Sequence, residues 1–172
     1  THPLERKEKG IWEIKIKLAD HPELSHKSKV KVVVQTEKGT KARIPAFATR
    51  VVQNDATKDY SAQLWFPKPY QWKSKADLQN TDEPLLIYET HIGMAQEKPA
   101  VGTYAEFEKN ILPYIKETGY NTIQIMALAE HPYYGSFGYH VSNFFAASSR
   151  FGTPEELKSL IDTAHGMGLK VI

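Results

Sequence analysis

The sequence predicts a β-rich segment over residues 1–83, followed by an α/β segment over residues 84–172. Apolar and polar residues alternate in the first segment, whereas short apolar runs alternate with helical patterns in the second. The charge changes at the same place. Residues 1–83 hold 16 Lys and Arg against 11 Asp and Glu, and residues 84–172 hold 6 against 9. The two segments therefore differ in structure and in surface character.

The first segment is expected to form three or four short strands. Residues 11–18 alternate between apolar and charged side chains, which predicts a half-buried antiparallel strand. Residues 30–34 repeat the pattern, and a turn containing Gly39 predicts a hairpin with residues 41–46. Without a helical pattern, these strands predict part of a β-sandwich. Residues 73–84 are polar and weakly patterned, which predicts a linker.

The second segment alternates strands and helices. Capping boxes at residues 103–106 and 153–156 predict the starts of two helices. Pro113 predicts a kink or break in the first helix at residues 109–113, and Gly119 and Gly168 are typical of helix ends. The strands between and around these helices are expected at residues 85–88, 121–128 and 169–172.

This β-α-β-α-β order predicts parallel strands with crossover helices, either in a doubly wound sheet or at the start of a (β/α)₈ barrel. No Gly-x-Gly-x-x-Gly motif follows the first strand, and no Gly-x-x-x-x-Gly-Lys motif occurs. Since dinucleotide and nucleoside-triphosphate sites depend on such motifs, the barrel is the preferred interpretation.

The most informative stretch is the long connection over residues 130–153. Connections between strands and helices usually have about 2–6 residues, so this one is expected to carry function. It contains 7 of the chain's 19 aromatic residues, and in a barrel it lies at the carboxyl ends of the strands, where active sites form. Aromatic rings beside polar groups are typical of sugar sites. We expect Tyr139 to face a ligand, and Phe144, Phe145 and Phe151 to form a small core of the loop.

Two runs carry a resemblance to a known family: IYETHIG at residues 87–93 and NTIQIMALAEHPYYGSFGYHVSNFFAASSRFGTPEELKSLIDTAHGMGLKVI at residues 121–172. They resemble the glycogen and starch branching enzymes of the α-amylase superfamily, in particular the eukaryotic type. A weaker resemblance covers residues 10–83, where GIWEIKI and SKVKVVV are similar to later strands of the glucan-binding β-sandwich that precedes the barrel. The resemblance implies a partial sandwich followed by the first β-α-β-α-β of a (β/α)₈ (TIM) barrel.

The resemblance also implies a set of substrate-binding residues. In this family the Tyr of the Gly-Tyr pair stacks on glucose at the cleavage site, and it matches Tyr139. The neighbouring His140 matches a position from which a polar side chain approaches the sugar. Tyr134 and Glu130 complete the expected substrate-binding set. From the residues alone, Glu130 is expected first of all to be a carboxylate that anchors the loop through backbone amides.

No catalytic residue is expected in this chain. The family's nucleophile, general acid and stabilising carboxylate follow the fourth, fifth and seventh strands, and residues 169–172 begin the third. Retaining sugar chemistry needs two carboxylates about 5–5.5 Å apart, and Glu89 and Glu130 are poor candidates. We also expect no metal site, since His91, His131 and His140 lack the spacing of metal ligands, and no cofactor.

We therefore expect a piece of a branching enzyme that cleaves α-1,4-glucan and forms α-1,6 branches in glycogen, inactive by itself. Thr1 at the start and an apolar run at the end are typical of a piece, whose partner is the remainder of its parent chain. A hydrolase or debranching enzyme, or a non-catalytic glucan-binding module, remains an alternative. The absence of Cys and of long apolar runs, with a net charge of +2, favours a cytoplasmic protein without membrane or nucleic-acid partners.

Overall fold

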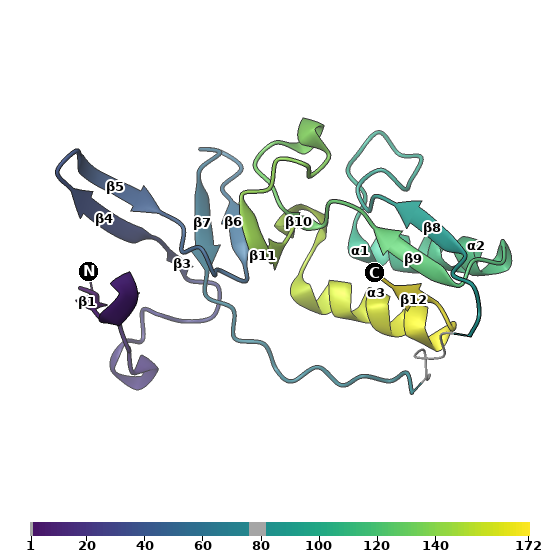
Figure 1. Ribbon diagram of the computed structural model, residues 1–172, viewed down its shortest axis with the longest axis horizontal. Helices are drawn as coiled ribbons and strands as arrows, with labels where there is room; N and C mark the ends of the chain where they lie inside the picture. Colours follow the sequence, from purple (N-terminus) through teal and green to yellow (C-terminus); the bar gives the residue numbers. More distant parts are fainter. Residues whose placement is uncertain (1, 76–81) are drawn as a thin grey trace.

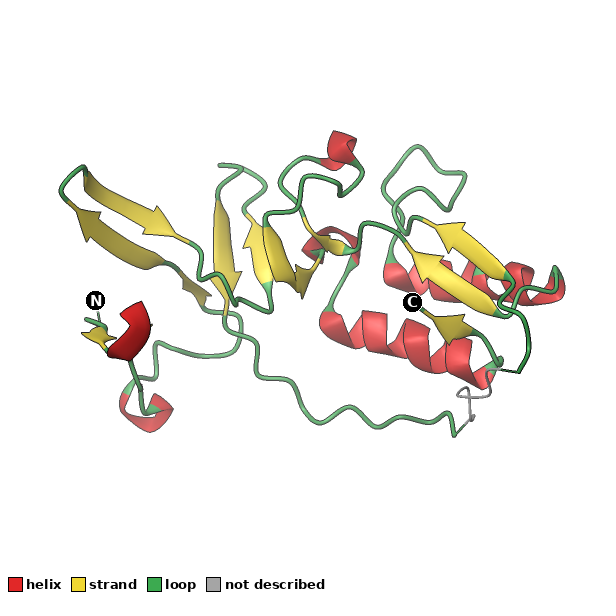
Figure 2. Cartoon of the chain, in the orientation of Figure 1, coloured by secondary structure: helices red, strands yellow, loops and turns green. Residues whose placement is uncertain are grey.

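The computed structural model describes residues 2–75 and 82–172, and it has an elongated arrangement of two parts (Figure 1). The first part contains only short strands and single 3₁₀ turns, and the second contains three α-helices and a parallel sheet (Figure 2). Part of the linker expected at residues 73–84 lies outside the described residues. The predicted order of a partial sandwich followed by the start of a barrel is confirmed.

The first part is built from three small antiparallel sheets. Their strands are β1 (Glu5–Arg6), β2 (Trp12–Glu13), β3 (Lys29–Val30), β4 (Val32–Thr36), β5 (Gly39–Arg43), β6 (Val51–Gln53) and β7 (Tyr60–Gln63). The expected hairpin is confirmed: β4 and β5 pair from Val32↔Arg43 to Thr36↔Gly39, around a tight turn. In Figure 1 this hairpin projects at the end of the molecule, and the sheet β3-β7-β6 lies nearer the helices.

The strand expected over residues 11–18 is wrong for most of its length. Only β2 forms there, pairing with β1 over two residues, and a 3₁₀ turn, η2, follows at Leu18–Asp20. The alternating apolar side chains stay largely uncovered: Trp12, Ile14 and Leu18 are 59%, 37% and 46% exposed. An alternating pattern gives a long strand only where a second layer buries its apolar side.

The second part has a parallel sheet in the order β12-β9-β8. Its elements are β8 (Ile87–Thr90), α1 (Tyr104–Asn110), α2 (Leu112–Glu117), β9 (Thr122–Ile125), α3 (Pro154–Gly166) and β12 (Lys170–Val171). The first strand was expected two residues earlier, but Leu85 and Leu86 are half exposed. The Asn121 side chain accepts from the Leu86 amide at 2.8 Å and thereby fixes where pairing begins.

The helices begin and break where local chemistry predicts. Thr103 and Thr153 both accept from the backbone N–H three residues on, and Glu106 and Glu156 bond back to the cap amides. The expected interruption near Pro113 is confirmed by the boundary between α1 and α2 at Ile111. All three helices pack with the sheet around one hydrophobic core. The fully buried residues of this core include Phe107, Leu112, Ile115, Ile123, Leu160 and Leu169.

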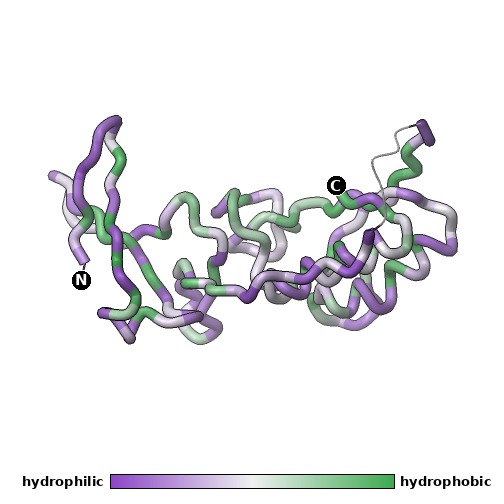
Figure 3. The backbone as a smooth tube through the Cα atoms, turned by 90° about the horizontal axis from the view of Figure 1, so that it is seen from below, coloured by the Kyte–Doolittle hydropathy of each residue, from purple (hydrophilic) through white to green (hydrophobic). Residues whose placement is uncertain are grey.

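Hydrophobic and hydrophilic residues alternate in short stretches along the chain (Figure 3). Within residues 2–75 and 82–172, no helix combines the length and the apolar character that crossing a membrane requires.

Candidate functional site

The candidate site lies where the parallel strands end. After β9, a turn at residues 126–128 leads into β10 (Ala129–Glu130), and the chain returns through β11 (Asn143–Ala147) before α3 begins. β10 and β11 pair antiparallel, an element that the sequence did not predict. The Met126 amide donates to the Thr90 carbonyl at 2.9 Å, which joins this loop to the carboxyl end of β8. The loop therefore stands at the edge where barrel enzymes hold their substrates.

Glu130 holds the two ends of the loop together. Its side chain is 1% exposed and accepts from the Ser149 amide at 2.8 Å and the His131 amide at 3.2 Å. The Ser148 hydroxyl lies 3.5 Å from the same carboxylate. A buried carboxylate requires such donors, so the loop-anchoring interpretation is confirmed. Direct contact between Glu130 and a sugar stays a prediction.

Tyr139 presents its ring to solvent from a tightly fixed backbone. Tyr139 is 68% exposed, while its amide donates to the Ser136 carbonyl at 3.0 Å. Gly138 has φ +87°, and a Cβ there would lie 2.3 Å from the Ala127 carbonyl oxygen. A glycine at this position allows another part of the chain to approach closely. The partner that approaches is the backbone of Ala127, which locks the loop in place beneath Tyr139.

A buried aromatic layer supports the loop from below. His91 and Phe151 meet edge to face with 5.5 Å between ring centroids, and Tyr104 meets Phe151 at 5.9 Å. This layer is tightly packed, because a Cβ added to Gly93 would lie 2.8 Å from the Phe151 ring. Tyr134 is half-buried in the same layer, and the Arg150 guanidinium lies 5.8 Å from its ring centroid. Tyr134 therefore packs its ring within this layer beside the Arg150 cation.

The expected small core of the loop is only partly formed. Phe151 is 1% exposed and belongs to the main core, whereas Phe144 and Phe145 are 78% and 57% exposed. The prediction for these two residues is wrong, because they lie on β11, where no second layer covers them. Phe145 meets the ring of Phe47 from the first part at 4.9 Å.

The three histidines considered as metal ligands have different surroundings. His140 is exposed beside Tyr139, whereas His91 and His131 are buried. Burial lowers the pKa of His91, which keeps its imidazole neutral. The His131 Nδ1 lies 3.0 Å from the Ala129 carbonyl oxygen. Among the residues that the structure describes, these three do not form a group with ligating geometry.

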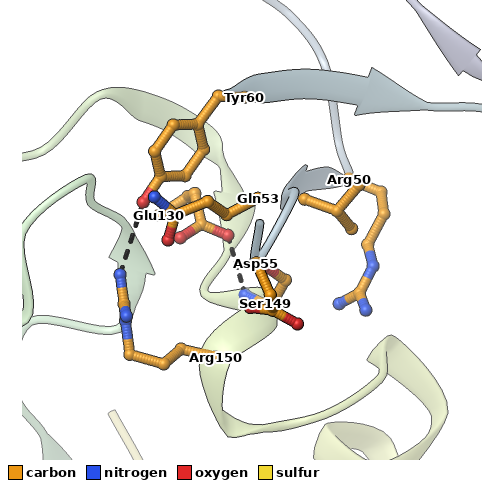
Figure 4. A pocket seen from close by; sticks show the side chains of 8 residues that line it. Arg50, Gln53, Asp55, Tyr60, Glu130, Ser149 and Arg150 are labelled. Atoms are coloured by element: carbon orange, nitrogen blue, oxygen red, sulfur yellow. Dashed lines mark hydrogen bonds between the residues drawn. The ribbon is translucent and has the colours of Figure 1, made fainter. Parts of the chain in front are cut away.

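A polar cleft of about 310 Å³ separates the first part of the molecule from the loop (Figure 4). Arg150 donates to the Tyr60 hydroxyl at 3.4 Å, and Tyr60 donates to the Pro132 carbonyl at 2.8 Å. The remaining residues around the cleft are Arg50, Val52, Gln53, Asp55, Glu130 and Ser149. This cleft could not be predicted from the sequence, because its residues come from four separate stretches of the chain.

The first part is also joined to the start of α3. Arg50, which is 8% exposed, donates to the Gly152 carbonyl at 2.8 Å and lies 5.0 Å from the Trp65 ring. Trp65 in turn donates to Glu155 at 3.0 Å. Asp162 on α3 accepts from the amides of Lys73 and Ser74, at 2.9 and 2.8 Å. Glu155 and Asp162 on α3 therefore both have a structural role.

The described residues offer a binding surface rather than a pair of reacting carboxylates. Glu130 is enclosed by its donors, and Glu89, exposed on β8, accepts from the Gln124 side chain at 3.2 Å. An exposed Tyr ring at a strand-end edge, with His140 beside it, is suited to hold a sugar by stacking and hydroxyl contacts.

Comparisons with known proteins agree with this arrangement. The family model described as the α-amylase catalytic domain matches residues 108–172. Among solved structures, a putative α-amylase from Salmonella typhimurium superposes with a TM-score of 0.61 at 26% identity, over 79% of this chain and 22% of that one. A type I pullulanase from Bacillus subtilis superposes with a TM-score of 0.69 over 98% of this chain and 27% of that one; at 19% identity it supports the fold alone.

The curated relatives include enzymes from distant eukaryotes. The 1,4-α-glucan-branching enzyme of Yarrowia lipolytica is 49% identical over 97% of this chain, and that of Dictyostelium discoideum is 48% identical over 99%. A chloroplastic/amyloplastic branching enzyme of Arabidopsis thaliana is 46% identical over 97%. The chain spans about a quarter of the length of these relatives. Nearly half of all residues agree along almost the whole chain, so this chain is similar to one stretch of the 1,4-α-glucan-branching enzymes, and its second part matches the α-amylase catalytic domain.

Proposed function

We propose that this chain provides the β-rich segment and the opening βα units of an enzyme that branches α-1,4-glucan, with Tyr139 as its sugar-stacking platform. The observation that carries the proposal is the exposure of the Tyr139 ring above a loop that Gly138 and Glu130 hold rigid. The C–H groups of a glucose ring pack well on an aromatic face, and a ring carried on a backbone that is already ordered loses less entropy when it binds. The relatives, all named 1,4-α-glucan-branching enzymes, support glucan as the ligand.

The neighbouring residues have distinct roles in this proposal. His140 is exposed beside Tyr139 and is placed to bond a sugar hydroxyl. Tyr134 supports the platform with its half-buried ring and offers its edge to the same ligand. Glu130 acts through the loop, because its donors hold residues 131 and 149 in position.

The proposed reaction breaks an α-1,4 bond, holds the released glucan chain on the enzyme and transfers it to a 6-hydroxyl, which creates an α-1,6 branch. Such retaining chemistry uses one carboxylate as the nucleophile and another as acid and base. Among the described residues, Glu130 is sequestered and Glu89 is bonded to Gln124. We therefore expect the 172-residue chain to bind glucan without converting it.

Binding is tested by glycogen co-sedimentation of the 172-residue chain and of Tyr139→Ala. The matched control is Tyr114→Ala, since Tyr114 is also half exposed but lies on α2. We expect Tyr139→Ala to weaken binding and Tyr114→Ala to leave it unchanged. If Trp12→Ala abolishes binding while Tyr139→Ala does not, the chain is a glucan-binding module whose ligand lies on the β-rich segment.

Activity is tested in a chimera in which this chain replaces the matching stretch of the Yarrowia lipolytica enzyme. We expect amylose treated with the chimera to gain α-1,6 linkages, and the 172-residue chain alone to produce none. Release of short linear sugars without new α-1,6 linkages would instead indicate a hydrolase. Tyr139→Ala in the chimera is expected to lower the rate by at least about tenfold, since a stacking contact of about 1.4 kcal/mol corresponds to that factor.

A further inference from the structure

A group of three ligand-type side chains lies far from the glucan site, near the start of the chain. His2 precedes β1, and His21 and Glu23 follow η2, so that 19 positions separate the two histidines. The fold brings His2 Nε2 within 3.3 Å of His21 Nδ1, and His21 Nδ1 within 3.0 Å of Glu23 Oε1. The third separation, from His2 Nε2 to Glu23 Oε1, is 4.0 Å.

These separations match those around a single small metal ion. Zn²⁺ binds imidazole nitrogen at about 2.0–2.1 Å and carboxylate oxygen at about 2.0–2.2 Å, almost always with tetrahedral geometry. Two ligand atoms at such distances and at tetrahedral angles lie about 3.4 Å apart. The three observed separations, 3.3, 3.0 and 4.0 Å, average about the same value.

Hydrogen bonds within this group leave one of its three atoms without a partner in the group. A carboxylate only accepts, and each neutral imidazole has one nitrogen that donates and one that accepts. If His21 Nδ1 donates to Glu23, the facing His2 nitrogen is left without a donor. If His21 Nδ1 instead accepts from His2, its lone pair opposes the carboxylate at 3.0 Å. A divalent cation between the three atoms accepts a lone pair from each of them at once.

Hydrogen bonds hold the backbone of the turn in place before any ion arrives. The His21 amide donates to the Leu18 carbonyl at 3.1 Å, and the His21 carbonyl accepts from Leu24 at 2.9 Å. The Ser28 hydroxyl donates to the Glu23 carbonyl at 3.0 Å. Pro22, between the two ligands, restricts the backbone further. Glu23 remains 59% exposed, so an ion can enter from solvent and keep a water as its fourth ligand.

We propose that His2, His21 and Glu23 form a Zn²⁺ site that fastens the start of the chain to the turn after η2. Two imidazoles and a carboxylate, with no thiolate, favour Zn²⁺ and its first-row neighbours over Mg²⁺ or Ca²⁺. Such a link has a structural purpose here. The β1–β2 hairpin has only two residue pairs, so a metal bridge from residue 2 to residues 21–23 limits the freedom of an otherwise weakly held segment.

The test is Zn²⁺ binding to the full chain by isothermal titration calorimetry, using the metal alone. We expect one Zn²⁺ per chain. His2→Asn and His21→Asn each lower the affinity by about tenfold or more, and Glu23→Gln lowers it as well. The matched controls are His140→Asn and Glu13→Gln, which remove an exposed imidazole and a carboxylate elsewhere and leave the affinity unchanged. Unchanged affinity in His2→Asn and His21→Asn, or an equal loss in His140→Asn, overturns the site.

A second measurement does not depend on how the variants fold. Co²⁺ bound to the unmodified chain is expected to give the intense visible bands of a four-coordinate ion. In NMR spectra, Zn²⁺ is expected to shift the imidazole signals of His2 and His21 ahead of those of His140. Shifts of all exposed histidines together would show non-specific binding and refute the proposal. The site is independent of the glucan platform, so either proposal can fail alone.

Discussion

The Arg50 guanidinium donates to the Gly152 carbonyl oxygen at 2.8 Å, although 102 residues separate the two in sequence. Gly152 directly precedes Thr153, the cap of α3, so one side chain of the β-rich part bonds to the backbone at the start of the longest helix. Burial lowers the pKa of Arg50, while nearby carboxylates, Glu130 first among them, oppose that shift. The two parts of the molecule are thereby coupled through a charged contact from which water is largely excluded.

We expect Arg50→Ala to lower the free energy of unfolding by about 1–3 kcal/mol, because the partly buried Gly152 carbonyl loses its donor. The loss of the cation above the Trp65 ring adds to this effect. Urea denaturation measures the change. Arg43→Ala is the control, since Arg43 is exposed and donates only to its neighbour's carbonyl, and it should leave the midpoint within error. Equal midpoints for both variants would show that the contact does not stabilise the fold.

Gly138→Ala should destabilise the loop more than Gly119→Ala. Both glycines have a positive φ, +87° and +89°, so both substitutions strain the backbone by about 1–2 kcal/mol. Only at Gly138 does the new Cβ also meet an atom, the Ala127 carbonyl oxygen at 2.3 Å. The difference in unfolding free energy between the two variants therefore isolates this collision. Gly138→Ala should also reduce glucan binding, and a variant that binds normally would contradict the rigid-loop argument.

Two phenylalanines near the end of the loop, Phe144 and Phe151, should respond differently to truncation. Phe151→Ala is expected to cost about 3–5 kcal/mol, because it opens a cavity between His91, Tyr104 and the loop. Phe144→Ala should change the stability by no more than about 0.5 kcal/mol, since its ring is 78% exposed. Thermal unfolding of the two variants measures both effects. A large loss in Phe144→Ala would reveal that β11 has a covering layer in solution.

Asp162 is expected to make the molecule sensitive to acid. The Ser74 amide, followed by that of Lys73, holds the pKa of this carboxyl below its usual range. A folded-state pKa below the unfolded value stabilises the fold at pH values above the unfolded pKa, and that contribution is lost as the pH falls through the folded pKa. Unfolding measured between about pH 6 and pH 2 should show a shallower acid-side loss for Asp162→Asn than for the unmodified chain.

The control for this titration is Asp55→Asn, which changes an exposed carboxylate and should retain the acid-side slope of the unmodified chain. The prediction fails if the slope of Asp162→Asn also matches that of the unmodified chain.

The features that the sequence predicted correctly depend on short-range chemistry. Both capping boxes, the break near Pro113 and the turn before Gly39 involve residues only a few positions apart. The parallel order of the strands followed from the helices between them, because a crossover leaves little choice of direction. The expectation that Tyr139 faces a ligand also came from its close neighbours in the sequence, and the structure leaves this residue exposed beside Gly138, which has a positive φ.

The wrong or missing predictions have a common physical cause, because each depends on contacts between residues that are far apart in the sequence. Residues 11–18 alternate like a strand, yet only β2 forms because no layer covers Trp12 and its neighbours. β10 and β11 pair across an intervening loop, and Phe144 on β11 stays exposed for want of a covering sheet. The residues of the cleft and of the His2–His21–Glu23 group meet only after folding.

Residues 64–75 form neither helix nor strand, but hydrogen bonds hold the end of this extended segment in place. The Lys73 and Ser74 amides both donate to the Asp162 carboxylate, and the Tyr70 hydroxyl donates to the same group at 3.2 Å. Hydrogen exchange at these two amides should consequently be as slow as in the neighbouring helix, since each must release a charged acceptor before it opens. A segment without regular secondary structure can thus fix the distance between a strand, β7, and a helix, α3.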